Sequence, residues 1–137
     1  MTDLMDLLER CEQASEPNRR LDAEIAVAFN YGCLEGAVKF LLDDVSDTNS
    51  GWVGHKFNGG FSAQIAPKFT GSIDAISQIL PDTWTHMEIC KPDEEHNGWT
   101  VHLIDAHDVD NSVTGFSKTY ILALCVVALE ARIKSIG

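Results

Sequence analysis

Residues 115–119 place an aromatic side chain, two hydroxyls and a lysine directly before a long apolar run. A helix that begins here would turn unpaired backbone N–H groups and the positive end of its dipole towards an anion, and Lys118 would add charge. The same residues are also typical of a plain helix start, in which Ser117 caps the backbone and the lysine is solvated. The candidate contacts to a phosphate-bearing ligand are Phe116, Ser117, Lys118 and Thr119.

A second group of polar and aromatic residues flanks a shorter predicted helix, residues 72–80. Asp74 in the first turn of this helix would repel a phosphate, so ribose hydroxyls are the more natural partners. Core packing is the alternative for the two aromatic residues, since most large aromatics in a small domain are structural. The candidate residues in this group are Phe69, Thr70, Ser72 and Trp84.

Basic residues end the last apolar run. Arg132 and Lys134 would offset the negative end of a helix dipole there, and both are also reserve candidates for phosphate contact. No nucleophile is paired with a base along the chain, and the glycine spacing of a P-loop is absent. We therefore predict neither an enzyme nor a cofactor.

Four residues are conceivable metal ligands, because two of them fall on one face of a predicted strand. Zinc sites usually show tighter ligand pairs, and the sequence contains no CxxC or HxxxH. We therefore predict no metal site. The four residues are His86, Cys90, His102 and His107.

The charge balance narrows the classes of partner. The 137 residues carry 10 Lys plus Arg against 21 Asp plus Glu, a net charge of −11. A duplex-binding protein needs a basic surface, so we predict no nucleic-acid partner. A small anion could still bind, because exposed charges beyond a Debye length of about 8 Å are largely screened.

The apolar and cysteine patterns predict a cytoplasmic protein without a membrane partner. The longest apolar stretch, residues 120–129, is about half of the roughly 20 residues that cross a bilayer. The acidic N-terminal segment lacks the features of a signal peptide. The cysteines show no disulfide spacing, so we expect them to be reduced and mostly packed in the core. They are Cys11, Cys33, Cys90 and Cys125.

Periodicity and turn residues predict the order of the elements. Asn58-Gly59 suits a tight hairpin turn between two short strands, and residues 44–51 form a polar loop. We expect helices over residues 4–15, 18–32, 34–43, 72–80 and 117–136, and strands within residues 52–66, 84–91 and 99–107.

The last predicted helix is apolar on every side along residues 120–129. Such a helix must be covered by a sheet and by something else, either other helices or a second subunit. The pattern predicts an α+β fold in which a small antiparallel sheet has helices on both faces, an α/β/α sandwich. We expect a single domain over residues 1–137, with residues 1–17 as an N-terminal helical extension.

Three segments in order resemble the motifs of the phage ABA-sandwich domain family. They are RRLDAEIAVAFNYG at 19–32, KFTGSIDAISQILPDTW at 68–84 and SKTYILALCVVALEARI at 117–133. Many members of that family carry a basic residue after the cysteine of the last segment. This chain departs from that pattern with Val126 and Val127 there, so these positions do not supply the charge-neutralising part of a family-type site.

The resemblance extends to the Thoeris anti-defence type one branch, whose members bind cyclic ADP-ribose-type immune signals without cleaving them. It implies a phage anti-defence protein in the cytoplasm of an infected bacterial host that sequesters such a signal or another cyclic nucleotide. It also implies a homo-oligomer, either a dimer or an assembly of dimers. The alternative is a non-catalytic phage adaptor that binds a protein through its acidic surface and its apolar C-terminal helix.

Overall fold

The computed structural model describes residues 4–31, 36–80, 84, 86–93, 97–106 and 108–136. Its elements in chain order are α1 (Leu4–Gln13), α2 (Arg19–Ala28), β1 (Val38–Phe40), α3 (Val45–Asn49), β2 (Trp52–Phe57), β3 (Gly60–Ile65), α4 (Ile73–Ser77), β4 (His86–Cys90), β5 (Trp99–Asp105), β6 (Asp108–Ser117) and α5 (Tyr120–Ile136).

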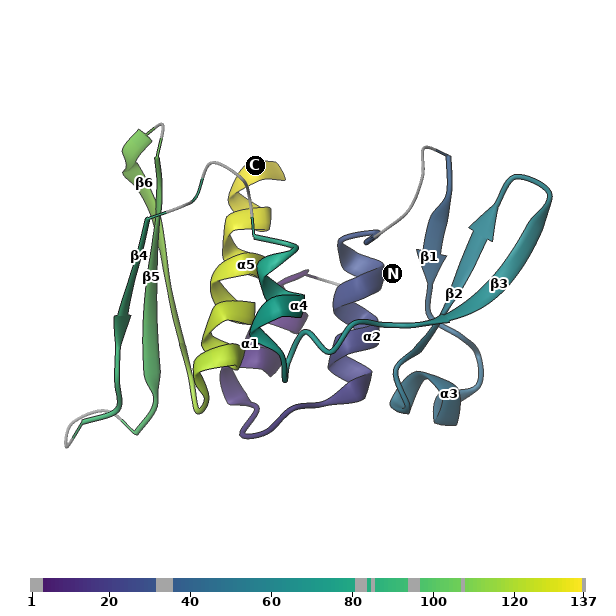
Figure 1. Ribbon diagram of the computed structural model, residues 1–137, viewed down its shortest axis with the longest axis horizontal. Coiled ribbons are helices and arrows are strands. Elements are labelled where there is room, and N and C mark those ends of the chain that lie inside the picture. The colour runs from purple at the N-terminus through teal and green to yellow at the C-terminus, as the bar shows by residue number, and fades with distance from the viewer. Residues whose placement is uncertain are drawn as a thin grey trace.

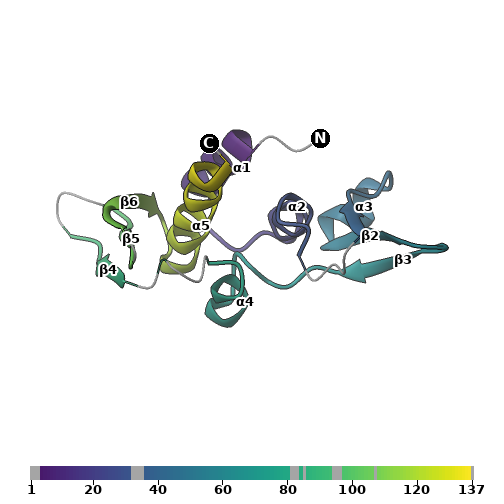
Figure 2. The same ribbon diagram turned by 90° about the horizontal axis from the view of Figure 1, so that it is seen from above.

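The strands form two antiparallel sheets, each with its strands in chain order: β1-β2-β3 and β4-β5-β6. The sheets stand at opposite ends of the molecule, and α1, α2, α4 and α5 lie between them (Figures 1 and 2). The predicted α+β class with antiparallel pairing is therefore confirmed. The layer order differs from the expected one, because the helices lie between two sheets instead of on both sides of one.

Helix α5 is enclosed within its own chain. Its central residues, 122–129, are at most 2% exposed. Gly115 of β6 makes the close approach of this helix possible, because a Cβ there would lie 2.8 Å from a methyl group of both Val126 and Val127. Helices α1 and α4 cover other sides of α5. The sequence analysis expected either other helices or a second subunit to cover this apolar helix, and the structure shows other helices of the same chain.

Helix α1 contributes to this core directly. Leu7 and Cys11 are fully buried, and Leu8 is nearly so. The hydroxyl of Ser117 at the end of β6 donates to the backbone oxygen of Cys11 at 2.7 Å. The N-terminal helix is thus tied to the last strand.

Three predictions about single elements are wrong. The helix expected over 34–43 is replaced, within the described residues, by β1, which pairs with β2 through Lys39 opposite His55. Gly36 has a φ of 82°, which is incompatible with a continuous helix. The polar loop expected at 44–51 contains the short helix α3, whose N-cap is Asp44.

The third wrong prediction is the start of the last helix at Ser117, because this residue ends β6, a strand that the sequence analysis did not predict. The pattern of β6 is polar, with Val113 and Gly115 as inward residues, so period-two hydrophobicity is weak. Ser117 is accordingly the end of a strand and not a helix cap. The cap of α5 is Thr119, whose hydroxyl accepts from Leu122 N at 3.1 Å.

The remaining elements follow the predictions. The hairpin turns at Asn58 and Gly59, and the glycine takes a φ of 89°. Ser72 caps α4 by accepting from Ala75 N at 3.3 Å. The proline expected to stop that helix, Pro81, lies outside the described residues.

Candidate functional site

Thr70 lies at the centre of a buried hydrogen-bond network. Its backbone N–H and its hydroxyl each donate to Asp22 Oδ1 at 2.7 Å, and the hydroxyl accepts from Asn18 N at 2.8 Å. Arg19 completes the network by donating to Asp22 Oδ2 at 2.6 Å and to Ala66 O at 2.7 Å. Since Thr70 and Asp22 are both 1% exposed, this network fastens the start of α2 to the segment before α4.

The two aromatic candidates of the second group are core residues. Phe69 is fully buried, and its ring meets Tyr31 edge-on with centroids 5.4 Å apart. Trp84 is 6% exposed. The packing alternative that the sequence allowed for both therefore describes their positions, and Ser72 serves as the cap of α4.

The candidates around 115–119 point in different directions. Phe116 lies on the outer side of the β4–β6 sheet opposite Thr100, whereas Ser117 is buried beneath α1. Lys118 is exposed, and Thr119 caps α5. These neighbours do not converge on one hollow.

Arg132 lies far from the start of α5. Arg132 is the thirteenth residue of α5, which begins two positions after Lys118, so about 18 Å of helix axis lies between Tyr120 and Arg132. Its guanidinium stands over the Phe29 ring, 5.6 Å from the centroid. The predicted site residues are thus divided among the core, two ends of α5 and the outer side of the β4–β6 sheet.

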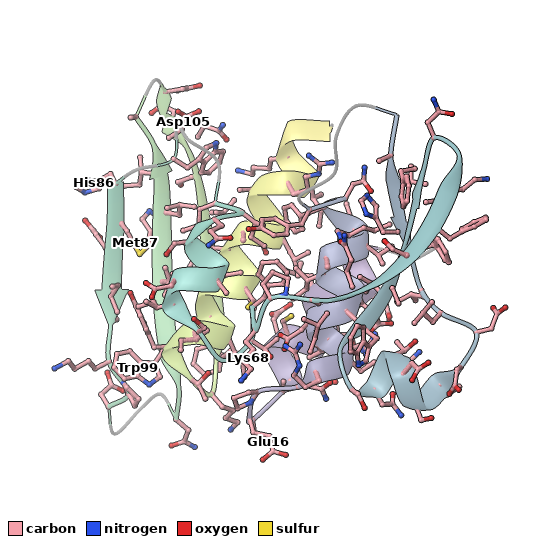
Figure 3. The ribbon with its side chains drawn as sticks, turned by 45° about the vertical axis from the view of Figure 1, so that its right-hand side comes forward. Glu16, Lys68, His86, Met87, Trp99 and Asp105 are labelled. Atoms are coloured by element: carbon pink, nitrogen blue, oxygen red, sulfur yellow. The ribbon has the colours of Figure 1, made fainter. Side chains whose placement is uncertain are left out.

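Three of the four conceivable metal ligands, His86, Cys90 and His102, lie within the described residues. Within the described ranges, no group of three or more His, Cys, Asp or Glu residues could hold a metal ion. His86 lies on the outer side of β4 (Figure 3), and His102 Nδ1 is 2.6 Å from Thr114 Oγ1. His107 lies outside the described residues.

Two further expectations concern cysteines and membrane spans. Cys11 and Cys125 are free and buried, as expected of packing residues, whereas Cys90 is free and exposed. Cys33 lies outside the described residues. Among the described helices, none is long and apolar enough to cross a bilayer.

The strands of the β1–β3 sheet contain no acidic residue. No Asp or Glu occurs between Asp47 and Asp74, although the chain carries 21 of them. Strands β2 and β3 lie wholly inside this acid-free segment, and β1 also lacks acids. Sequence reasoning missed this signal, which is readable without coordinates. Of the two sheets that the structure describes, the β1–β3 sheet is the one whose strands contain lysines and no Asp or Glu.

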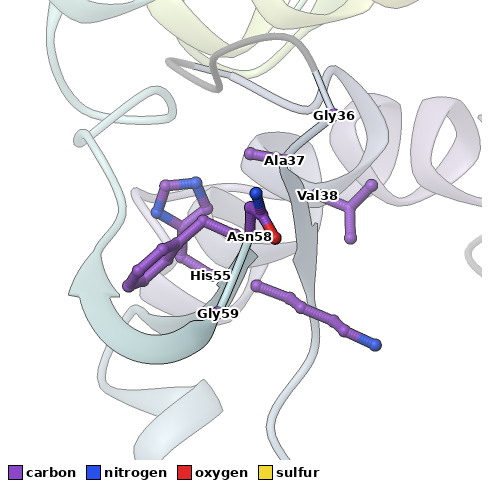
Figure 4. A pocket seen from close by; sticks show the side chains of 8 residues that line it. Gly36, Ala37, Val38, His55, Asn58 and Gly59 are labelled. Carbon is purple, nitrogen blue, oxygen red and sulfur yellow. The ribbon is translucent and has the colours of Figure 1, made fainter.

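A pocket opens at the hairpin end of this sheet (Figure 4). Its volume is about 970 Å³, within the range of small-molecule sites. His55 and Phe57 have ring centroids 5.8 Å apart, and His55 Nε2 is buried with no hydrogen-bond partner among the described residues. We call this the hairpin pocket; it is lined by Gly36, Ala37, Val38, His55, Lys56, Phe57, Asn58 and Gly59.

The hairpin pocket offers three kinds of contact. Phe57 supplies an aromatic face, Asn58 an amide, and His55 an imidazole nitrogen that needs a partner. Lys56 also lines the pocket, but its ammonium lies on the other side of β2 from His55 and Phe57, over the Phe61 ring. None of the described lining residues is a carboxylate. The aromatic, amide and imidazole groups suit a ligand with a planar base and hydrogen-bonding groups, and no carboxylate among the described lining residues opposes an anionic group on it.

A search of protein-family models, one of curated proteins and one of solved structures each found no match to this chain.

Proposed function

We propose that this chain is a non-catalytic binding protein that takes up a small anionic ligand of nucleotide type in the hairpin pocket. The family resemblance narrows the ligand to a cyclic ADP-ribose-type or cyclic nucleotide signal. Binding without cleavage would withhold this signal from its receptor, which is the anti-defence role that the resemblance implies for a phage protein in an infected bacterial cell.

The observation that carries the proposal is the orphaned Nε2 of His55 beside an aromatic ring. A buried polar atom without a partner costs free energy, on the order of 1–3 kcal/mol, that a bound acceptor or donor would recover. His55 lines a hollow of suitable size, and none of its described lining residues is an acid. A ligand oxygen or base nitrogen is the kind of partner that His55 needs.

The ligand would lie elsewhere than at the residues that the sequence singled out. The hydroxyl of Thr70 donates to Asp22, and the hydroxyl of Ser117 donates to the backbone of α1. A ligand contact at either hydroxyl would first have to break a buried hydrogen bond. Binding in the hairpin pocket breaks no side-chain hydrogen bond that the structure describes for His55, but the His55 ring has to turn to bring its buried Nε2 to the ligand.

The test is a thermal-shift and native mass-spectrometry panel of cyclic ADP-ribose isomers and cyclic nucleotides. We expect one class to raise the Tm, because a ligand that binds only the folded state stabilises it. The ligand should leave with unchanged mass on heating. A ligand released with an altered mass would show that the protein is an enzyme and would contradict the proposal. An unchanged Tm with every ligand of the panel would also refute the proposal.

Matched variants locate the site. His55→Ala should abolish the shift, whereas His102→Ala, which removes an imidazole from the β4–β6 sheet, should leave it intact. Lys118→Glu tests the site that the sequence predicted, and we expect binding to survive that change. Loss of binding in Lys118→Glu with retention in His55→Ala would move the ligand to the start of α5.

The protein-binding adaptor remains the second candidate function. One of its two proposed surfaces, the apolar C-terminal helix, is enclosed in the core and is not accessible to a partner. The adaptor would have to use its acidic surface or the exposed face of the β1–β3 sheet.

A further inference from the structure

We infer that two copies of this chain associate by packing the outer faces of their β1–β3 sheets against each other. The outer face is the side of the sheet opposite to the buried Val53. Pairing of Lys56 with Val38 and with Phe61, and of Trp52 with Ile65, brings its residues onto one side. They are Val38, Phe40, Trp52, Gly54, Lys56, Phe61, Ala63 and Ile65.

The outer face is apolar and open. Phe61 is 71% exposed, Ile65 58% and Val38 48%, and Trp52 and Phe40 are more than a third exposed. Phe40 and Phe61 meet edge-on with centroids 6.5 Å apart, so the rings form a connected surface. Strand β3 stands at the rim of the molecule in both views (Figures 1 and 2).

The exposed area fits a partner of the same kind. Five large apolar side chains at these exposures leave roughly 500 Å² of surface, near the upper end for a patch on a monomer. Two such faces together bury roughly 1,000 Å², the lower limit for a specific protein interface. The contact should therefore be real but weak enough to dissociate on dilution.

Charge selects a second copy over other apolar partners. The outer face carries no carboxylate, so two chains of net charge −11 can meet there without opposing acids in the contact. Its one charged residue is Lys56, whose ammonium lies 5.8 Å from the centroid of the Phe61 ring. Anionic lipid surfaces and nucleic acid would meet strong repulsion from the rest of the chain.

The geometry also distinguishes face packing from edge pairing. The two-residue turn makes Phe57 and Gly60 a hydrogen-bonded pair, so the alternation of an antiparallel ladder turns the backbone groups of Phe61, Ala63 and Ile65 away from β2. A second copy could pair along that edge instead. Face packing needs the side chains of these residues, whereas edge pairing needs their N–H groups.

The experiment is light scattering coupled to size exclusion over a concentration series of the full chain. Wild type should move from the monomer mass of 15.1 kDa towards twice that mass as concentration rises through the micromolar range. Phe61→Glu and Ile65→Lys should each stay monomeric at the highest concentration. Val45→Glu, which alters an equally exposed residue on α3, should dimerise like wild type.

Ala63→Pro decides between the two modes. Proline removes the outward N–H but keeps the apolar face, and edge strands tolerate it. A dimer in Ala63→Pro supports face packing, whereas a monomer there would assign the contact to the β3 edge and overturn the inference. A dimer that survives Phe61→Glu would also overturn the inference. A wild type that stays monomeric would overturn it as well, and would leave the outer face free for a different protein.

The dimer surface and the proposed ligand site share Val38 and Lys56, but the variants that test them alter unshared residues. Phe61 and Ile65 do not line the hairpin pocket, and His55 is not on the outer face. Loss of ligand binding in His55→Ala and loss of the dimer in Phe61→Glu can therefore be measured independently.

Discussion

The two sheets of this molecule share one topology but differ in what covers them. The β4–β6 sheet turns Val101, Leu103 and Val113 into a core closed by α5, and all three are at most 3% exposed. Every residue of β3 except Gly60 is exposed, and the aromatic rings of the β1–β3 sheet face solvent. The closed half holds the fold, whereas the open half carries the pocket and the apolar face.

The largest effect should come from breaking the buried network that joins α2 to the core. Asp22→Ala leaves Arg19 without its carboxylate and Thr70 without an acceptor. We expect a loss of about 3–5 kcal/mol in the free energy of unfolding, the usual cost of breaking a buried pair. Urea denaturation measures it. Asp43→Ala, at an exposed acid, is the control, and equal midpoints for both variants would contradict the structural role of Thr70.

A pair of glycine substitutions compares the two halves directly. In Gly115→Ala the new Cβ would meet Val126 and Val127 inside the closed core, which should cost about 1–3 kcal/mol. In Gly54→Ala the new Cβ would meet the ring of Phe40, which is partly exposed and can turn into solvent. We expect a cost below about 1 kcal/mol there. Thermal unfolding measures the Tm of both variants. A lower Tm for Gly54→Ala than for Gly115→Ala would contradict the difference between the closed and the open half.

Cysteine labelling sharpens the picture of the closed interior. A hydrogen bond with Cys11, together with burial, raises the pKa of the Cys125 thiol well above its usual range. Alkylation needs the thiolate and access, so Cys125 should react slower than Cys90 by about two orders of magnitude or more. Mass mapping of iodoacetamide-labelled peptides measures both rates. Similar rates at the two sites would mean that the core opens readily.

The smallest expected effect is a pH dependence on the surface of α5. Burial, and then the nearby Glu12, raise the pKa of Glu130 above 4.5. The folded state therefore holds a proton that the unfolded chain has released, so this group lowers stability as the pH rises from 4.5 through the folded-state pKa.

Glu130→Gln removes that penalty and should stabilise the protein at neutral pH by up to about 0.5 kcal/mol. The gain should shrink towards acidic pH, where Glu130 is protonated in both states. Denaturant midpoints over a pH series check the trend, with Glu16→Gln as the control at an exposed acid. A gain that is constant with pH would exclude the titration of Glu130 as its cause.

Strong periodicity made most of the closed half predictable. The apolar run of α5, the stripe of α1 and the alternation of β5 each identified their element. Strand β6 was not predicted because its inward positions include Gly115, which has no side chain and so adds nothing to a period-two hydrophobic pattern. Strand β1 escaped because three residues are too few for periodicity, and it forms through pairing with β2.

The candidate site was harder to predict than the fold. The role of Thr70 depends on Asp22, which is 48 positions away, and no local pattern connects the two. A hydroxyl before a helix is equally typical of a ligand contact and of an internal anchor. The acid-free segment between Asp47 and Asp74 was the readable clue, because in a strongly acidic chain it indicates a surface selected for another purpose.

Hydroxyl-radical footprinting of the intact chain at low and high protein concentration tests the division into two halves most directly. It measures side-chain accessibility residue by residue. The account predicts that oxidation of Phe61 and Trp52 slows as concentration rises, while Phe116 and Ile89, exposed on the other sheet, keep their rates. Protection of Phe116, or unchanged rates at Phe61, would contradict it.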